Sequence, residues 1–213
     1  MATDVRIEAV TEPSFGENAY VVSSGGACWI IDPGLPPSAD QILEYIKDER
    51  LKPVAIILTH GHADHIAGVP QILEAFPSLP VHISAEAQPA LTQPRENLSS
   101  DLGLPLRVDV AKILELPAPS ELRLSQSTWQ VFDTSGHAPG SRSLYCADAG
   151  AVIVGDALFH SSIGRTDFPH SDHDTLIRNI HEKLFTLPDE TRVYSGHGPV
   201  TTIGRERKHN PFL

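Results

Sequence analysis

Residues 53–70 read P-V-A-I-I-L-T-H-G-H-A-D-H-I-A-G-V-P, a short apolar run that leads directly into a loop rich in imidazole and carboxylate side chains. The β-branched residues within 53–58 favour a buried strand. A strand that ends in such a loop delivers its polar side chains to the carboxyl edge of a sheet, where α/β proteins place their sites. The stretch therefore predicts an α/β protein with a functional site at one sheet edge.

Four side chains of this loop can bind a metal ion, namely His60, His62, Asp64 and His65. His60 and His62 are two positions apart, so in extended backbone they point the same way and can hold one ion. Gly61 between them allows a tight turn. Asp64 and His65 then open a new turn and face elsewhere, which suits a second ion. Imidazole and carboxylate ligands favour zinc, iron or manganese over a soft metal.

The composition is that of one folded domain. Of the 213 residues, 40% are hydrophobic and 20% are charged, which is ordinary for a globular protein with a sizeable core. The net charge is −11. Such a chain lacks the basic surface that nucleic acid requires, so we expect no nucleic-acid partner. A small anionic substrate is compatible with this charge if a few cations lie near the site.

Cysteine content and hydropathy indicate the cellular compartment of the protein. Cys28 and Cys146 lie in apolar or alternating segments without Cys-x-x-Cys spacing, so we expect two small buried side chains. The chain has no apolar stretch of about 18 residues and no basic start followed by an apolar run. We therefore expect a cytoplasmic protein without a membrane partner, as a monomer or a homodimer.

Periodicity predicts alternating strands and helices along the chain. The predicted strands are 5–10, 19–22, 27–31, 53–58, 81–84, 122–124, 129–132, 144–146, 151–154 and 192–195. The predicted helices are 38–50 with Ser38 as N-cap, 68–76 and 172–187. Residues 85–120 are proline-rich and irregular, and we expect them to form a lid-like excursion that lines the substrate pocket.

Three later strands end as the strand before His60 does. His137, Asp156 and His197 each follow a predicted strand after a small residue. With the four side chains of the first loop, they make seven candidate ligands at strand ends. Asp32, which follows the 27–31 strand, has two interpretations: support of a metal ligand from behind, or a plain turn residue.

The H-x-H-x-D-H motif at 60–65, followed in order by His137, Asp156 and His197, resembles the metallo-β-lactamase superfamily over nearly the whole chain. The resemblance implies an αββα sandwich, in which helices flank two mixed β-sheets and the metal site lies at one edge. It further implies a single domain over 1–213. Because the chain ends soon after His197, we expect no separate C-terminal helical domain.

The resemblance also implies how the ligands divide between two divalent ions. The first ion would be bound by three histidines, His60, His62 and His137. The second would be bound by Asp64, His65 and His197, and Asp156 would bridge the two ions. Asp64 and Asp156 are then catalytic as well as metal-binding residues. Zinc is the favoured metal, with iron or manganese as alternatives, and paired cations generate a hydroxide nucleophile at neutral pH.

Further segments resemble the short form of the glyoxalase II group, which consists of hydroxyacylglutathione hydrolases. They are residues 155–159, 162–169, 202–207 and 210–212. The likeness implies cleavage of a thioester such as S-D-lactoylglutathione. A cysteine commonly stands at the position of Asp156 in zinc-dependent β-lactamases, so antibiotic cleavage is not expected.

Within these segments, Arg165 stands where the glyoxalase II group places a cation for the glutathione carboxylate. The resemblance therefore implies a small anionic thioester as substrate. An ion pair or turn contact with Asp167 is an alternative interpretation of Arg165.

A second reaction class has a similar signature. Persulfide dioxygenases share the implied fold and a Gly-Arg-Thr-Asp-Phe run like that at 164–168. They use one iron ion, for which the corresponding ligands here are His60, His137 and Asp156. Other hydrolases of the superfamily, including lactonase-like ones, are a further alternative.

Overall fold

Alternating apolar side chains give the central strands two buried faces. On β4 (Lys52–Ile57), the neighbouring residues Ile56 and Ile57 are both fully buried but belong to different apolar clusters. Successive side chains of a strand point to opposite faces of its sheet. A strand with both faces buried must therefore lie inside a layered structure.

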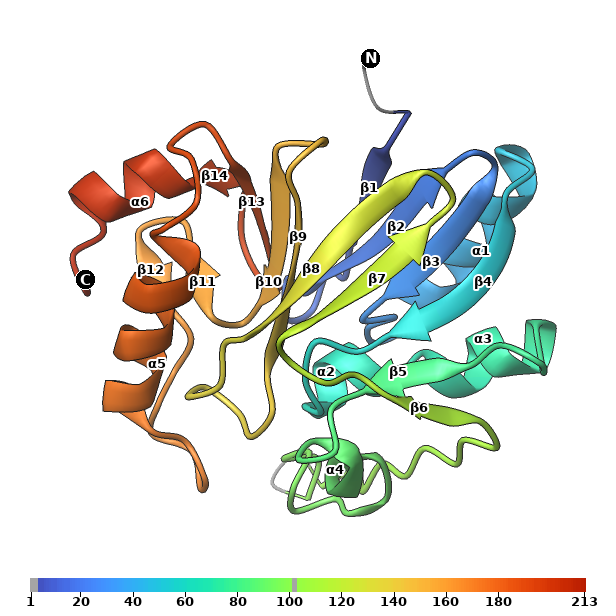
Figure 1. Ribbon diagram of the computed structural model, residues 1–213. Helices are drawn as coiled ribbons and strands as arrows, with labels where there is room; N and C mark the ends of the chain where they lie inside the picture. The colour runs from blue at the N-terminus through green and yellow to red at the C-terminus, as the bar shows by residue number, and fades with distance from the viewer. Residues whose placement is uncertain (1–3, 101–102) are drawn as a thin grey trace.

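The computed structural model describes residues 4–100 and 103–213, so residues 101 and 102 of the predicted excursion lie outside the described residues. Within them, the strands form two six-stranded sheets that face each other, with helices on both outer sides (Figure 1). Both sheets contain parallel and antiparallel pairs. The predicted αββα sandwich of two mixed sheets is confirmed.

The first sheet holds the N-terminal strands in chain order. Its members are β1 (Arg6–Thr11), β2 (Asn18–Ser24), β3 (Ala27–Ile31), β4 (Lys52–Ile57), β5 (Val81–Ile83) and β6 (Ile113–Glu115). The first three pair antiparallel, whereas β3 to β6 run parallel. The parallel strands end at one edge, and the His-rich loop leaves β4 there.

The second sheet has the order β14-β13-β10-β9-β8-β7. Its members are β7 (Ser120–Leu124), β8 (Ser127–Asp133), β9 (Arg142–Cys146), β10 (Ala151–Gly155), β13 (Arg192–Ser195) and β14 (Thr201–Thr202). Strands β10 and β13 are parallel neighbours, so Asp156 and His197 leave this sheet at the same edge. A small hairpin of β11 (Leu158–Phe159) and β12 (Ser162–Ile163) follows β10.

Helices cover the outer faces of both sheets (Figure 1). They are α1 (Ser38–Asp48), α2 (Ala63–Ile66), α3 (Val69–Ala75), α4 (Gln88–Thr92), α5 (His173–Asn179), the π-helical turn η1 (Ile180–Leu184) and α6 (Ile203–His209). The predicted helices are present as α1, α3 and α5 with η1, whereas α2, α4 and α6 were not predicted. None of the helices in the described part of the chain has the length and apolar character needed to cross a membrane.

The predicted N-cap role of Ser38 is wrong. Pro37 occupies the N-cap position of α1, and Ser38 is the first helical residue, with its Oγ buried and without a hydrogen-bond partner in the described residues. The N–H of Ser38 instead bonds to the Leu35 carbonyl in the preceding turn. That turn carries the chain into the helix one residue earlier than the sequence pattern indicates.

The predicted excursion over 85–120 contains two regular elements, α4 and the edge strand β6. Between them, the buried Asn97 amide donates to the carbonyls of Ala90 and Leu106 at 2.7 and 3.1 Å. The backbone carbonyl of Asn97 accepts a hydrogen bond from the backbone N–H of Ala63. This segment is therefore joined to the His-rich loop by hydrogen bonds.

Apolar side chains fill the spaces between the layers. Ile42 of α1 and Ile56 of β4 belong to the cluster between the first sheet and its helices. Ile57 and Trp129 belong to the cluster between the two sheets. Leu176 of α5 belongs to the cluster that covers the second sheet. The layers are thus held together by burial of apolar surface, the dominant favourable contribution to folding.

Replacing Trp129 with Ala is expected to lower the free energy of unfolding by about 3–5 kcal/mol, because it leaves a cavity between the sheets. Trp129 is fully buried, and its ring meets that of Trp29 edge-on with centroids 5.9 Å apart. Urea denaturation of the metal-free protein measures the change. Phe212→Ala is the control, since Phe212 is 55% exposed and should change stability by no more than about 0.5 kcal/mol. Equal effects of the two substitutions would contradict this account of the core.

Candidate metal centre

The edge where the strands of both sheets end collects all seven predicted ligands. The loop after β4 carries His60 and His62, and the short helix α2 that follows carries Asp64 and His65. The loops after β8, β10 and β13 carry His137, Asp156 and His197. Six of these side chains form two groups of three, in each of which the potential ligand atoms lie within 4.8 Å of one another. The third such cluster in the described residues joins Asp32 to His60 and His65.

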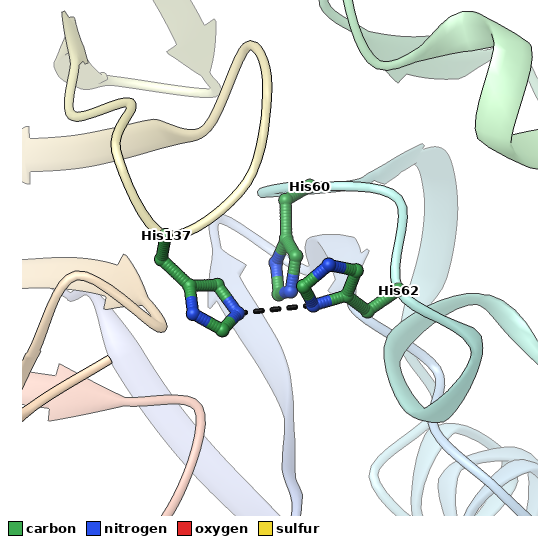
Figure 2. Close-up of side chains that lie close together, drawn as sticks. All are labelled: His60, His62 and His137. Atoms are coloured by element: carbon green, nitrogen blue, oxygen red, sulfur yellow. Dashed lines mark hydrogen bonds between the residues drawn. The ribbon is translucent and has the colours of Figure 1, made fainter. Parts of the chain in front are cut away.

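The first group consists of His60, His62 and His137 (Figure 2). The Nδ1 atom of His62 and the Nε2 atom of His137 are 3.0 Å apart. His60 is fully buried, and its Nε2 has no hydrogen-bond partner among the described residues. Three imidazole nitrogens therefore converge on one small space.

The second group consists of Asp64, His65 and His197. The Nε2 atom of His197 lies 3.3 Å from Oδ2 of Asp64. The Nε2 atom of His65 lies 3.9 Å from the same oxygen. His65 is fully buried, whereas Asp64 and His197 are partly exposed.

Asp156 lies between the two groups. Its Oδ2 is 3.5 Å from Nε2 of His137 in the first group and 3.5 Å from Nε2 of His197 in the second. Its Oδ1 is 3.4 Å from Nε2 of His65. One carboxylate thus contacts both groups. Gly196 makes room for it, because a Cβ at Gly196 would lie 2.1 Å from Oδ1 of Asp156.

Hydrogen bonds on the far side of the rings orient the imidazoles. The Nδ1 of His137 donates to the Arg165 carbonyl at 2.8 Å, and the Nδ1 of His197 donates to the Phe15 carbonyl at 3.2 Å. The Nε2 atom of His137 then carries a lone pair, as does that of His197 in its neutral form, and both atoms face Asp156. This is the arrangement that metal-binding histidines have in proteins, where an outer partner fixes the tautomer.

Asp32 supports the second group from behind. Its Oδ2 lies 3.1 Å from Nδ1 of His65 and accepts from the Thr59 hydroxyl at 2.5 Å. The Thr59 hydroxyl also lies 3.1 Å from Nδ1 of His60. The structure therefore agrees with the interpretation of Asp32 as a residue that supports a metal ligand from behind. Thr59 is an additional member of this support.

Burial and neighbouring imidazoles keep the first group neutral. Together they hold the pKa of His60 well below its ordinary value and lower the pKa of His62 to about 3. Burial also lowers the pKa of His137. Three neutral imidazoles can offer lone pairs to a cation without first losing a proton.

Carboxylates have the opposite influence on the second group. Burial opposes protonation of His65, but the charges of Asp156 and Asp64 outweigh burial and hold the pKa of His65 well above its ordinary value. Burial likewise opposes protonation of His197, and its hydrogen bond to Asp64 raises the pKa nonetheless. The pKa of Asp156 lies well below its usual range, because the surrounding histidines outweigh its burial.

The residues fit a divalent cation. In the described chain, the Nε2 atoms of His60 and His65 and the Oδ1 atom of Asp156 are buried without a hydrogen-bond partner. Unpaired buried polar atoms are costly, and those of a folded protein are normally satisfied. Imidazole nitrogen and carboxylate oxygen are the ligands that zinc and other transition metals bind.

A pocket of about 410 Å³ opens above the centre. Apart from the candidate ligands, its wall is formed by Phe15, Ala63, Asn97, Leu98, Phe159, Arg165 and Phe168. The guanidinium of Arg165 donates to both oxygens of Asp167 at 2.9 and 2.8 Å and lies 4.5 Å from the centre of the Phe168 ring. The ion pair with Asp167, which is one interpretation of Arg165, is therefore present at the pocket wall.

The pocket residues differ in how far the sequence signals them. Phe15 lies in a loop without such a signal, and its position depends on segments distant in sequence, whereas Leu98 comes from the 85–120 excursion that is predicted to line the pocket. Phe168, like Arg165, belongs to the Gly-Arg-Thr-Asp-Phe run, which signals pocket residues in the sequence. The polar residue Thr59, directly before His60, is a second signal that sequence reasoning overlooked.

Comparison with known proteins agrees with the geometry. Residues 14–197 match the family described as the metallo-beta-lactamase superfamily. The chain belongs to this superfamily. The match includes all seven candidate ligands, and the predicted resemblance is confirmed.

Two curated relatives are similar over nearly their full length. The probable metallo-hydrolase YqgX of Bacillus subtilis is 41% identical over 197 residues, which is 92% of this chain and 92% of YqgX. The hydroxyacylglutathione hydrolase GloC of Haemophilus influenzae is 32% identical over 213 residues, which is 98% of each chain. Membership of the metallo-β-lactamase superfamily and these relatives support the coarser part of the functional prediction, a metallo-hydrolase.

Solved structures have the same fold. The BLEG-1 B3 metallo-beta-lactamase superposes with a TM-score of 0.90 at 39% identity, covering 98% of this chain and 99% of BLEG-1. TTHA1623 in a di-iron-bound form superposes with a TM-score of 0.85 at 36% identity, covering 97% of this chain and 100% of TTHA1623. The metallo-β-lactamase fold therefore extends over nearly the whole chain.

The two groups should lose metal at different pH. Protons compete for His65 and His197, whose pKa values are raised, so binding to that group strengthens as pH rises through those values. The pKa of His62, at about 3, leaves the first group free of this competition between about pH 5 and pH 8. A His197→Ala variant, which keeps the first group, should therefore retain zinc to lower pH than His62→Ala, which keeps the second.

The measurement is the zinc content of both variants after dialysis against limiting zinc across this pH range. Wild-type protein dialysed in parallel controls for the total capacity. If both variants lost zinc at the same pH, the first group would not differ from the second in its competition with protons, and the prediction would be wrong.

Proposed function

We propose that this protein is a metal-dependent hydrolase that cleaves a small thioester, with S-D-lactoylglutathione or a related hydroxyacyl thioester as the substrate class. The observation that carries the proposal is the position of the Asp156 carboxylate between two complete groups of candidate ligands. The GloC relative, a hydroxyacylglutathione hydrolase, supports the thioester part of the proposal.

The chain has ligands for two divalent cations. His60, His62 and His137 would hold one, Asp64, His65 and His197 the other, and Asp156 would contact both. Zinc fits this donor set, and the hard oxygen of Asp156 also suits iron or manganese. When bound, such cations supply Lewis acidity and lower the pKa of a bound water towards neutrality.

The residues around the pocket favour a thiolate as leaving group. Apart from the candidate ligands, Arg165 is the ionisable side chain that lines the pocket in the described residues, and its pKa is raised further by the hydrogen bonds to Asp167. It therefore keeps its protons and is a poor acid. A thiol has a pKa of about 8.5, so a thiolate leaves without protonation, whereas the nitrogen of an amide requires a proton.

Aromatic side chains limit access of water to the reacting group. Phe15, Phe159 and Phe168 come from different segments of the chain and line the same pocket. The Phe168 ring lies 5.6 Å from that of His62 and 5.9 Å from that of His137. An acyl group bound against these rings is held close to the nitrogen atoms of the first group, which reduces the entropic cost of reaching the transition state.

The deciding experiment is hydrolysis of S-D-lactoylglutathione by purified protein that has been stripped with a chelator and reloaded with zinc, iron or manganese. We expect turnover in at least one metal form and none in the stripped protein. Asp156→Ala should abolish both turnover and metal binding, because it removes the carboxylate that contacts both groups. Full metal content with normal turnover in Asp156→Ala would contradict the bridging role.

A persulfide dioxygenase would give a different result in this experiment. If every metal form fails to hydrolyse the thioester while the iron form consumes oxygen with glutathione persulfide, the protein is a persulfide dioxygenase. A β-lactam in a parallel sample tests amide cleavage. Hydrolysis of the β-lactam at a rate equal to that of the thioester would contradict the argument from the leaving group.

Replacing Arg165 with Ala should raise the KM for S-D-lactoylglutathione about fivefold, corresponding to about 1 kcal/mol, with little change in kcat. The reason is that Arg165 is the cation at the pocket wall and would contact the anionic thiol portion. Steady-state kinetics measures the effect. Arg6→Ala is the matched control, since Arg6 forms an exposed ion pair with Glu49 and does not line the pocket. An unchanged KM would assign Arg165 to the Asp167 contact alone.

A further inference from the structure

One buried carboxyl group near the metal centre has no role in the arrangement described so far. The Glu17 side chain is fully buried, and in the described residues neither of its oxygens has a hydrogen-bond partner. Burying an unpaired polar group is unfavourable, and an apolar side chain would avoid this cost. Because Glu17 lowers the stability of the fold in this way, we expect it to have a functional role.

Glu17 lies directly behind the second group. Its Oε1 is 3.9 Å from Nδ1 of His65, the nitrogen that also lies 3.1 Å from Oδ2 of Asp32. The backbone of Glu17 forms an antiparallel bridge with His197. Two carboxyl groups therefore face the outer nitrogen of His65, while its Nε2 faces Asp156 and Asp64.

The fold keeps space open for this carboxyl group. A Cβ at Gly34 would lie 1.9 Å from Oε2 of Glu17, so any side chain at Gly34 would displace the carboxyl group. Gly34 follows β3, in the same turn as Asp32. The turn that presents Asp32 to His65 is thus shaped to admit Glu17 as well.

We propose that Glu17 is a positioning residue for the metal centre, whose carboxyl group acts with Asp32 on the outer nitrogen of His65 and thereby strengthens cation binding by Asp64, His65 and His197. The proposal rests on the metal centre of the proposed function. It concerns the affinity of one half of that centre and does not depend on which substrate is cleaved.

The physical reason is electrostatic. A cation held by His65 would draw electron density from the ring, and the ring would acquire positive charge that nearby carboxyl groups stabilise. At 3.9 Å in a buried site, this interaction is much stronger than in water. Removal of such an outer partner typically lowers metal affinity about 10- to 100-fold. In the described residues no hydrogen bond or ion pair joins Glu17 to the first group, so that group should be unaffected.

Without a cation, the same carboxyl group is unfavourable. Glu17 then lies in a buried region that also contains Asp32, Asp64 and Asp156, and it has no donor of its own. The Glu17 carboxyl group should therefore lower the stability of the metal-free protein and raise the affinity for the metal. A residue that merely fills space would change metal-free stability and leave affinity unchanged.

The test introduces Glu17→Gln into His62→Ala, which leaves the second group complete, and into His197→Ala, which leaves the first. Zinc affinity is measured by competition with a chromophoric chelator, and the Tm is measured on metal-free protein. We expect Glu17→Gln to lower affinity about tenfold in the His62→Ala protein and less than about twofold in the His197→Ala protein. The metal-free Tm should stay the same or rise.

Two further variants keep the test decisive. Glu17→Leu replaces the carboxyl group by an apolar side chain and should reproduce the loss of affinity, which covers the case in which Gln at this position fails to fold. Glu8→Gln removes a charge from an exposed position of β1 and should leave affinity unchanged. Unchanged zinc affinity in the Glu17 variants, equal losses in both backgrounds, or a lower metal-free Tm with unchanged affinity would overturn the proposal.

Failure of this inference is distinguishable from failure of the proposed function. Wild-type protein that binds zinc but hydrolyses no thioester would refute the hydrolase proposal, while the affinities would still decide the role of Glu17. Wild-type protein that binds no divalent metal would overturn both, and this result comes from the wild-type sample alone.

Discussion

The site depends on one electrostatic constraint, which is that the buried carboxylate of Asp156 must be surrounded by imidazole nitrogens from both sheets. His65, His137 and His197 each approach an oxygen of Asp156 to within 3.4–3.5 Å. These side chains follow β4, β8, β10 and β13, so they meet only if both sheets end at one edge. The αββα arrangement is thus a requirement of the site, and its apolar layers supply the stability that allows polar groups to be concentrated there.

Outer hydrogen bonds connect this centre to the rest of the chain. The carbonyls of Arg165 and Phe15 accept from His137 and His197, and both residues also line the pocket. The same short segments therefore orient candidate ligands and form the surface that contacts a substrate. This connection couples metal binding to the shape of the pocket.

Support from behind the centre has a cost in stability. Asp32 satisfies its carboxylate with Thr59 and His65, whereas Glu17 is buried beside them without a donor. Functional sites often retain groups that destabilise the metal-free or ligand-free protein. The Asp32 carboxylate is satisfied by hydrogen bonds within the fold. The Glu17 carboxyl group would become favourable only when a cation is bound nearby.

Local patterns predict most of the strands and the order of the candidate ligands, because strand periodicity and residue type are local properties, whereas the αββα sandwich is implied by the resemblance to the metallo-β-lactamase superfamily. The sequence patterns did not reveal α2, α4, α6, the Pro37 cap of α1 or Glu17. Glu17 approaches His65 from 48 positions away, counted as 65 − 17, and no local pattern encodes that contact. Which nitrogen of His137 and of His197 faces inward depends on tertiary packing, since their outer partners, the Arg165 and Phe15 carbonyls, are brought there by distant segments.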